Sequence, residues 1–199
     1  TQFASSAASD VYKRQPLTPE IIEGYRTMGA LAEDDALIKL DGTGELDHRR
    51  ACRPFADNCG FTLAEASQFV ILFDDELALE LGAHIYAGVG DVFVNADGFK
   101  KSIPGPGIGN YVTVGKAMGT VRAILGDKAL SERSYMQAHG TGTPQNRVTE
   151  SHNFDAMAKA FGIKDWPVAA IKAYLGHSLA CASGGSNYRF AWCLAGWGD

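Results

Sequence analysis

The feature of this sequence that most constrains its fold is a strand, a helix and a second strand in succession. Residues 134–138 and 168–171 are short segments typical of strands, and residues 148–161 between them carry apolar side chains at helical spacing. Strands that alternate with helices indicate a sheet covered by helices. The segment therefore predicts α/β architecture.

The rest of the chain continues this alternation. Thr18 followed by Pro19 is a typical helix start, and glycine is a typical residue just after a helix. The other expected elements are a helix at 18–30, a buried strand within 61–73, a short helix from Asp74 to Gly82, a long strand at 83–95 and a helix ending at Gly126.

Composition excludes several classes of protein. Hydrophobic residues make up 46% of the 199 residues and charged residues 21%, which predicts a packed interior rather than disorder. The net charge of -5 lacks the Lys/Arg excess that phosphate binding requires, so we expect no nucleic-acid partner. Since no apolar run approaches the roughly 18 residues that cross a bilayer, we expect no membrane span.

The four cysteines are spaced neither as CxxC pairs nor as a dense framework. They are Cys52, Cys59, Cys181 and Cys193. Such spacing is typical of reduced thiols in a cytoplasmic protein. We therefore expect cytoplasmic localisation, no disulfides and no zinc site.

Two histidines stand in matching positions. His139 and His177 each follow a predicted strand, and each has glycine and hydroxyl residues beside it. Ligands of α/β proteins usually bind at the carboxyl ends of strands. The separation of 38 residues is enough for one excursion from strand to strand, so we expect both side chains at one site.

The segments around these histidines, AHGTGTP and IKAYLGHSLACASG, resemble the paired motifs of the β-ketoacyl-[acyl carrier protein] synthases. Upstream, ACRPFADNCGFTLAEASQFVILFDDELALELGAHIYA is similar to another stretch of that family, and the blocks follow the family's order over roughly residues 45 to 184. The resemblance implies an incomplete thiolase-like layered α/β fold. It also implies decarboxylative Claisen condensation of an acyl thioester with malonyl-[acyl carrier protein], in fatty-acid or polyketide synthesis.

The resemblance further implies roles for six residues. The two histidines polarise the malonyl thioester carbonyl, a lysine paired with a glutamate holds the local charge, and two threonine hydroxyls contact the phosphopantetheine arm of the carrier. The catalytic positions are His139, His177, Lys172 and Glu150, and the substrate-binding positions are Thr141 and Thr143. No metal and no bound cofactor are expected, because phosphopantetheine arrives with the substrate.

The chemistry of these residue types suits that reaction. Decarboxylation of a malonyl thioester leaves an enolate, so the site needs hydrogen-bond donors aimed at the developing oxyanion. Histidine, with an unperturbed pKa of about 6.5, is a neutral donor near physiological pH when it is buried.

The sequence also departs from the family. The family's nucleophilic cysteine, in a context such as TACSS, has no counterpart here, and we expect its place at or just before residue 1; the GFGG loop is missing too. Arg147 stands where many members carry an acid. We interpret residues 1–15 as a non-native leader, 16–184 as part of a synthase domain and 185–199 as a divergent tail.

Partners follow from the same resemblance. We expect the acyl carrier protein, acyl and malonyl thioesters, and a homodimer of the full-length protein. One alternative is a non-catalytic synthase homologue that acts as a chain-length or scaffolding partner. A metal hydrolase using His139 and His177 is disfavoured, because no carboxylate or third histidine stands at a metal-ligand spacing.

Overall fold

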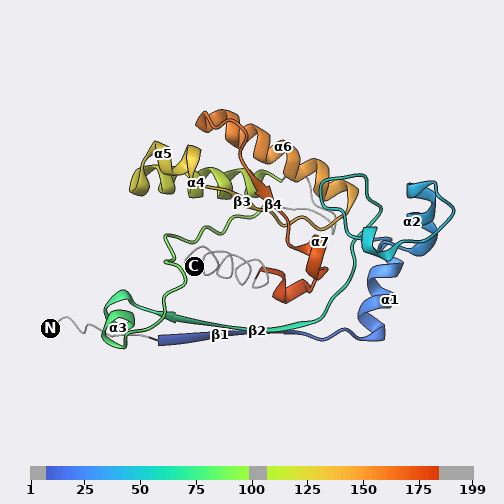
Figure 1. Cartoon of the computed structure of the whole chain (residues 1–199), viewed down its shortest axis with the longest axis horizontal. Coiled ribbons are helices and arrows are strands. Elements are labelled where there is room, and N and C mark those ends of the chain that lie inside the picture. The colour runs from blue at the N-terminus through green and yellow to red at the C-terminus, as the bar shows by residue number, and fades with distance from the viewer. Residues whose placement is uncertain (1–7, 99–106, 184–199) are drawn as a thin grey trace.

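The computed structural model describes residues 8–98 and 107–183, so the tail at 185–199 lies outside the described residues (Figure 1). The strands are β1 (Ala8–Gln15), β2 (Ala66–Phe73), β3 (Met136–Gln137) and β4 (Val168–Ala169). The helices are α1 (Pro19–Thr27), α2 (Asp34–Asp41), α3 (Asp75–Glu80), α4 (Ile108–Leu125), α5 (Asp127–Glu132), α6 (Pro144–Phe161) and α7 (Lys172–Leu175), with 3-10 turns at His48–Arg50 and Leu179–Cys181. Within the described part of the chain, no helix has the length and hydropathy that crossing a bilayer requires.

The second half of the chain forms the strand, helix, strand unit that the sequence predicts. β3 and β4 are parallel neighbours, with Met136 beside Val168 and Gln137 beside Ala169. Helix α6 connects them, and α4 packs against α6 on the same side of the strands (Figure 1). The two strands are only two residues long, because the backbone leaves the ladder just before His139 and after Ala169.

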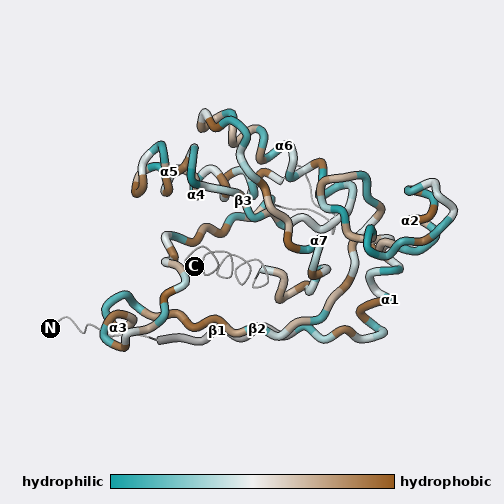
Figure 2. The backbone as a smooth tube through the Cα atoms, in the orientation of Figure 1, coloured by the Kyte–Doolittle hydropathy of each residue, from teal (hydrophilic) through white to brown (hydrophobic). Residues whose placement is uncertain are grey.

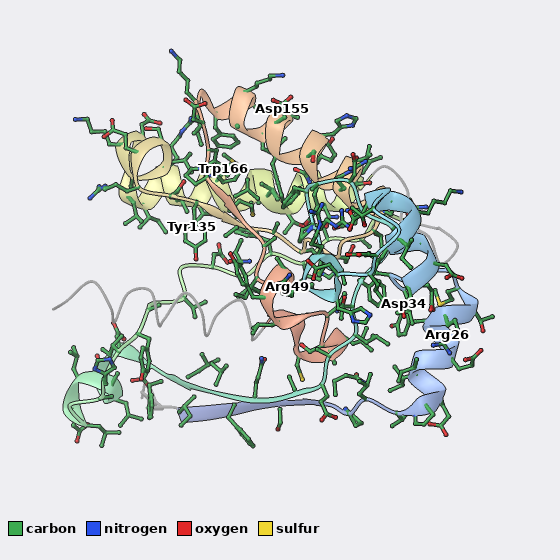
Figure 3. The ribbon with its side chains drawn as sticks, turned by 45° about the vertical axis from the view of Figure 1, so that its right-hand side comes forward. Arg26, Asp34, Arg49, Tyr135, Asp155 and Trp166 are labelled. Atoms are coloured by element: carbon green, nitrogen blue, oxygen red, sulfur yellow. The ribbon has the colours of Figure 1, made fainter. Side chains whose placement is uncertain are left out.

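The hydrophobic core lies among α4, α5 and the end of α6. Met118, Leu130 and Ile163 form its centre and are 3%, 2% and 7% exposed. Trp166 packs against this cluster beside α6 (Figure 3), and its indole N–H donates to the Ser134 hydroxyl at 2.9 Å. The core therefore anchors both the start of β3 and the approach to β4.

Helix α6 begins four residues earlier than the expected start at residue 148. Thr143 has extended backbone geometry, and its hydroxyl accepts from the Asn146 N–H at 3.4 Å, while Pro144 occupies the first turn. Gly162, with φ of +70°, ends the helix as expected. The cap joins the helix directly to the turn that contains His139, which places Glu150 on the second turn.

Strand β2 pairs antiparallel with β1 in a long two-stranded ribbon (Figure 1). The expectation of a buried strand here is wrong: Phe69 is 68% exposed and Ile71 is 63% exposed. Figure 2 shows the apolar colour along β2. Among the described residues, the turn at Leu179–Cys181 contacts this ribbon, but Phe69 and Ile71 stay exposed. The interpretation of residues 1–15 as a foreign leader stays a prediction.

No strand forms at 83–95, which contradicts the sequence prediction. A strand requires a neighbour for its backbone N–H and C=O groups, and within residues 8–98 and 107–183 no other strand pairs with this segment. Val92 and Val94 are 72% and 90% exposed. The β-branched composition alone was therefore insufficient to form the element.

Candidate functional site

The fold brings His139 and His177 together. Their ring centroids lie 5.2 Å apart and the ring planes cross at 87°, so the rings meet edge to face. His139 lies two residues after β3. His177 lies two residues after α7, rather than directly after a strand as the sequence predicted, because the short helix α7 follows β4. The neighbouring backbone fixes His177. Its N–H donates to the Thr62 carbonyl at 2.7 Å, and its carbonyl accepts from the Ala64 N–H at 3.1 Å.

Neighbouring groups fix the tautomer of both rings. The Leu179 backbone N–H donates to Nδ1 of His177 at 3.0 Å. The Lys172 ammonium, which has only protons to donate, lies 3.4 Å from Nδ1 of His139. Since each Nδ1 is an acceptor, the proton of each neutral ring is on Nε2. We therefore assign two neutral imidazoles that each retain one N–H donor.

Lys172 and Glu150 hold the backbone of His139 from opposite sides. The Lys172 ammonium donates to the His139 carbonyl at 2.5 Å. The two Glu150 oxygens accept from the His139 N–H at 2.8 Å and the Gly140 N–H at 2.7 Å. Lys172 is 2% exposed and Glu150 is 8% exposed. These two described side chains form no direct ion pair, so the pairing that the resemblance implied is replaced by a bridge through His139.

The turn after His139 needs glycine at two positions. Gly140 has φ of +52° and Gly142 has φ of +88°. A Cβ on Gly142 would lie 2.9 Å from the Gly60 carbonyl oxygen, so the turn rests on that loop without room for a side chain. Thr141 and Thr143 flank Gly142, and their hydroxyls lie 3.0 Å apart. The two threonines proposed to contact the substrate arm therefore act as one hydroxyl cluster.

Burial and charge keep both histidines neutral. Burial of the ring, followed by the Lys172 charge, lowers the pKa of His139 to about 4, although the residue as a whole is exposed. The same two causes and the neighbouring His139 lower the pKa of His177 to about 4; it is 8% exposed. Burial also lowers the pKa of Lys172, while the Glu150 charge opposes this shift. The site therefore holds neutral donors beside one buried cation.

The lowered histidine pKa values predict the pH dependence of the folded site. The unfolded chain binds protons on these rings near pH 6.5, whereas the folded site binds them only near pH 4. The folded state thus carries fewer protons, and we expect its stability to fall as the pH falls from about 6.5 to about 4.

NMR titration of the two imidazoles measures this effect, with both midpoints expected near pH 4. A Lys172→Met variant removes a charge that lowers both pKa values, so its midpoints should move upward. Midpoints near 6.5 in the unsubstituted protein would contradict the lowered pKa values of the pair.

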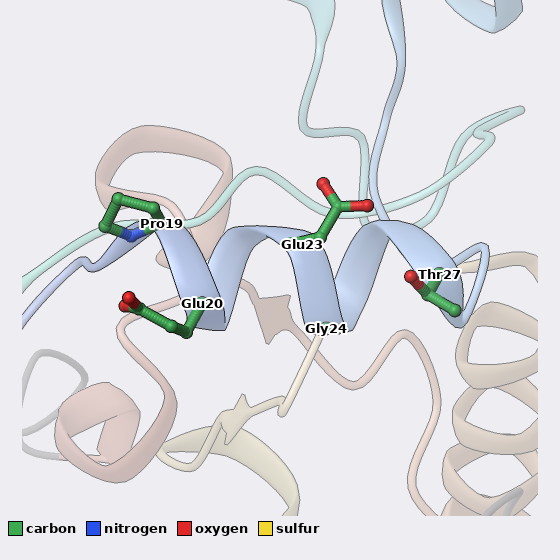
Figure 4. A pocket seen from close by; sticks show the side chains of 5 residues that line it. All are labelled: Pro19, Glu20, Glu23, Gly24 and Thr27. Carbon is green, nitrogen blue, oxygen red and sulfur yellow. The ribbon is translucent and has the colours of Figure 1, made fainter.

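A shallow pocket of about 560 Å³ lies along α1, away from the histidines (Figure 4). Its lining residues are Pro19, Glu20, Glu23, Gly24 and Thr27. This pocket contains no histidine, cysteine or lysine, so it offers none of the predicted chemistry. Among the described residues, no group of three or more histidine, cysteine or acidic side chains is placed to hold a metal ion.

Comparison with known proteins identifies the family. Residues 86–194 match the family described as β-ketoacyl synthase, C-terminal domain. The chain is 59% identical over 168 residues to the β-ketoacyl-[acyl-carrier-protein] synthase FabY of Pseudomonas aeruginosa, an alignment that covers 84% of this chain. The chain belongs to the β-ketoacyl synthase family. It spans 26% of the length of FabY.

Solved ketosynthase structures share this fold. The crystal structure of the noncanonical ketosynthase FabY from P. aeruginosa superposes with a TM-score of 0.88 at 53% identity, over 94% of this chain and 29% of that one. The ketosynthase of AntDE:AntF, a complex of a type II polyketide acyl-carrier protein with its ketosynthase, matches with a TM-score of 0.69 at 26% identity, over 92% of this chain and 42% of that one. The thiolase-like α/β fold expected from the sequence is confirmed.

Two of the described cysteines have raised pKa values and a third is fully buried. Burial raises the pKa of the Cys52 and Cys59 thiols, and thiolate is the nucleophilic form. Cys181 is fully buried, and its Sγ lies 3.3 Å from the Ala66 carbonyl oxygen. Cys193 lies outside the described residues. The expectation that none of these cysteines is the nucleophile stays a prediction.

Sequence reasoning missed three contributors to the site around the two histidines. The Leu179 N–H sets the tautomer of His177, from a residue with φ of +48°. The Phe61 ring lies 5.1 Å from the His177 ring, and the Asn146 side chain accepts from the Thr141 N–H at 2.9 Å. The Leu179 N–H is a backbone donor, and such donors leave no signal in the sequence. Asn146 could have been found, because it is a polar residue close to the His139 turn, directly before Arg147.

Proposed function

We propose that the full-length protein containing this chain catalyses decarboxylative Claisen condensation between an acyl thioester and malonyl-[acyl carrier protein]. The observation that carries this proposal is the pair of neutral histidines, 5.2 Å apart, with Nδ1 of each occupied and Nε2–H free to donate. Such donors stabilise an oxyanion without supplying a proton that would quench it. Membership of the β-ketoacyl synthase family supports the same reaction.

The proposed reaction begins at the malonyl thioester. Its C–C bond to the carboxylate breaks, carbon dioxide leaves, and the electron pair passes into an enolate whose oxygen accepts from His139 and His177. The enolate carbon then attacks an acyl thioester on the enzyme's cysteine, which forms the new C–C bond and releases the thiolate. Lys172 and Glu150 act by holding the backbone of His139 in place.

Thr141 and Thr143 are the proposed contacts for the phosphopantetheine arm, because their paired hydroxyls stand on the turn that carries His139. An acyl carrier protein is the proposed partner, supported by AntDE:AntF, a complex of an acyl-carrier protein with its ketosynthase. The same proposal includes a cytoplasmic homodimer. A non-catalytic partner role is not favoured, because FabY and an Escherichia coli relative, 32% identical, are named as synthases.

The test of the proposal is a chimera of FabY. The 168 aligned residues of this chain replace the corresponding segment of the P. aeruginosa enzyme. If this segment supplies the decarboxylation site, the chimera should release labelled carbon dioxide from malonyl-carrier at a rate within about tenfold of FabY, a loss of under about 1.4 kcal/mol in activation free energy.

Native FabY and a chimera with both His139 and His177 replaced by alanine serve as the controls. A chimera that matches FabY in mass and melting behaviour but releases no carbon dioxide would overturn the proposed function. Carbon dioxide release that persists in the histidine-free chimera would overturn the assignment of the site.

A further inference from the structure

Arg147 joins helix α6 to the loop at residues 52–60. Its Nη1 donates to the Ala56 carbonyl at 2.7 Å and to the Asp57 carboxylate at 2.8 Å. The Arg147 side chain is 29% exposed and the Asp57 side chain is 86% exposed. The bond to the carbonyl is therefore the better protected half of the contact, because an exposed ion pair is weakened by water.

The loop that Arg147 holds lies directly under the turn of His139. Gly142 approaches the Gly60 carbonyl so closely that a Cβ would meet it at 2.9 Å, and the same Cβ would lie 3.6 Å from Cys52 Sγ. On the other side, the Asn58 amide donates to the Arg53 carbonyl at 2.8 Å and keeps the loop folded. A shift of this loop would remove the support of the turn.

We propose that Arg147 is a positioning residue that fixes the loop at 52–60 against the turn and so sets the place of the Thr141 and Thr143 hydroxyls. Arg147 lies on α6 one turn before Glu150, whose carboxylate holds the other end of the same turn. Helix α6 thus fixes the turn in two ways, directly through Glu150 and indirectly through Arg147, which holds the loop at 52–60. The inference rests on the proposed function, because the hydroxyls matter only if a substrate arm passes them.

The test compares two substrates in the full-length synthase that contains this chain. Malonyl-carrier passes the threonine hydroxyls with its whole arm, whereas malonyl-N-acetylcysteamine has only a short thioester end. Arg147→Ala should raise KM for malonyl-carrier about tenfold, the usual cost of one charge-assisted hydrogen bond. KM for the short thioester should change less than about twofold, because the histidines are held by other groups.

Two further substitutions separate the halves of the contact. Arg147→Lys retains a donor for the Ala56 carbonyl and should restore most of KM for malonyl-carrier. Asp57→Asn removes only the exposed ion pair and should raise KM less than about fivefold.

Arg122→Ala is the matched control, because Arg122 also bonds a backbone carbonyl, that of Phe161 at 3.0 Å, and an aspartate, Asp127 at 2.7 Å. It joins α4 to the far end of α6, so neither KM should change. An unchanged KM for malonyl-carrier in Arg147→Ala, or an equal rise for both substrates, would overturn the positioning role. Absence of turnover in the unsubstituted enzyme would instead count against the proposed function.

Discussion

Replacing His139 or His177 with alanine should slow decarboxylation of malonyl-carrier about 100-fold to 1,000-fold, the usual cost of removing one donor to a developing oxyanion. The two rings meet edge to face at 5.2 Å, and each offers one Nε2–H because its Nδ1 is occupied. Since both N–H groups are proposed to stabilise one enolate oxygen, the double variant should be little slower than either single variant. Release of labelled carbon dioxide by the full-length synthase measures all three rates.

His152→Ala is the matched control for this experiment. His152 lies on α6 with an exposed side chain, so its removal should leave the rate unchanged. Transfer of the acyl group to the enzyme's cysteine should suffer much less than decarboxylation, because that step forms no malonyl enolate. Normal decarboxylation in either single histidine variant would remove that histidine from the site, and losses that multiply in the double variant would indicate two separate roles.

Much of the site around His139 and His177 could be predicted from the sequence, because its residues lie next to recognisable turn and helix-cap residues. His139 and Glu150 belong to one turn and the helix that follows it, and the Thr143 cap with Pro144 fixes their relative placement within a few residues. His177 needed one longer step, the return of the chain from α6 through β4 to α7. A strand, helix, strand unit makes that return nearly obligatory.

The hydrogen-bond partners of Lys172 and Glu150 within the site could not be predicted in the same way. A glutamate and a lysine at matching family positions suggest a direct ion pair, yet here each binds the backbone of His139 from its own side. Which donor a buried carboxylate binds depends on distances of about one ångström between segments that are far apart in sequence. Residue type indicates charge, but it does not indicate whether a backbone N–H competes for that charge.

The errors in the first half of the chain have a different cause. Residues 83–95 and β2 have strong strand composition, and only β2 forms a strand, because β1 pairs with it. Strand propensity largely reports packing against neighbours, so it cannot specify a strand by itself. The exposed Phe69 and Ile71 show the same limit for burial: an apolar run predicts a buried face only where another layer covers it.

Replacing Glu150 with alanine should destabilise the full-length synthase by about 3 to 5 kcal/mol, the usual cost of leaving a buried charge uncompensated. The substitution leaves the N–H groups of His139 and Gly140 without acceptors, and it leaves Lys172 buried without its counter-charge. Burial raises the pKa of Glu150, so this carboxyl itself pays a desolvation cost that its two N–H donors and Lys172 offset. The free energy of unfolding in denaturant measures the loss.

Asp155→Ala is the control on the same helix. Asp155 accepts from the Lys159 ammonium at 2.6 Å in a pair whose side chains are 63% and 75% exposed. Such exposed pairs contribute about 0.3 to 0.5 kcal/mol, so this variant should unfold almost like the unsubstituted protein. If Glu150→Ala costs no more than Asp155→Ala, the bridge through His139 does not stabilise the fold.

Glu150→Gln should separate the charge of this residue from its hydrogen bonds. A glutamine has one acceptor oxygen, and its NH₂ group must face the second backbone N–H as another donor. We therefore expect only one of the His139 and Gly140 amides to stay protected from hydrogen exchange, whereas both stay protected with glutamate and both exchange faster with alanine. Decarboxylation should fall in the same order, because each lost bond frees the backbone that positions the His139 ring. Equal protection of both amides in Glu150→Gln would contradict this account, since it would mean that an acceptor other than the carboxylate holds the turn.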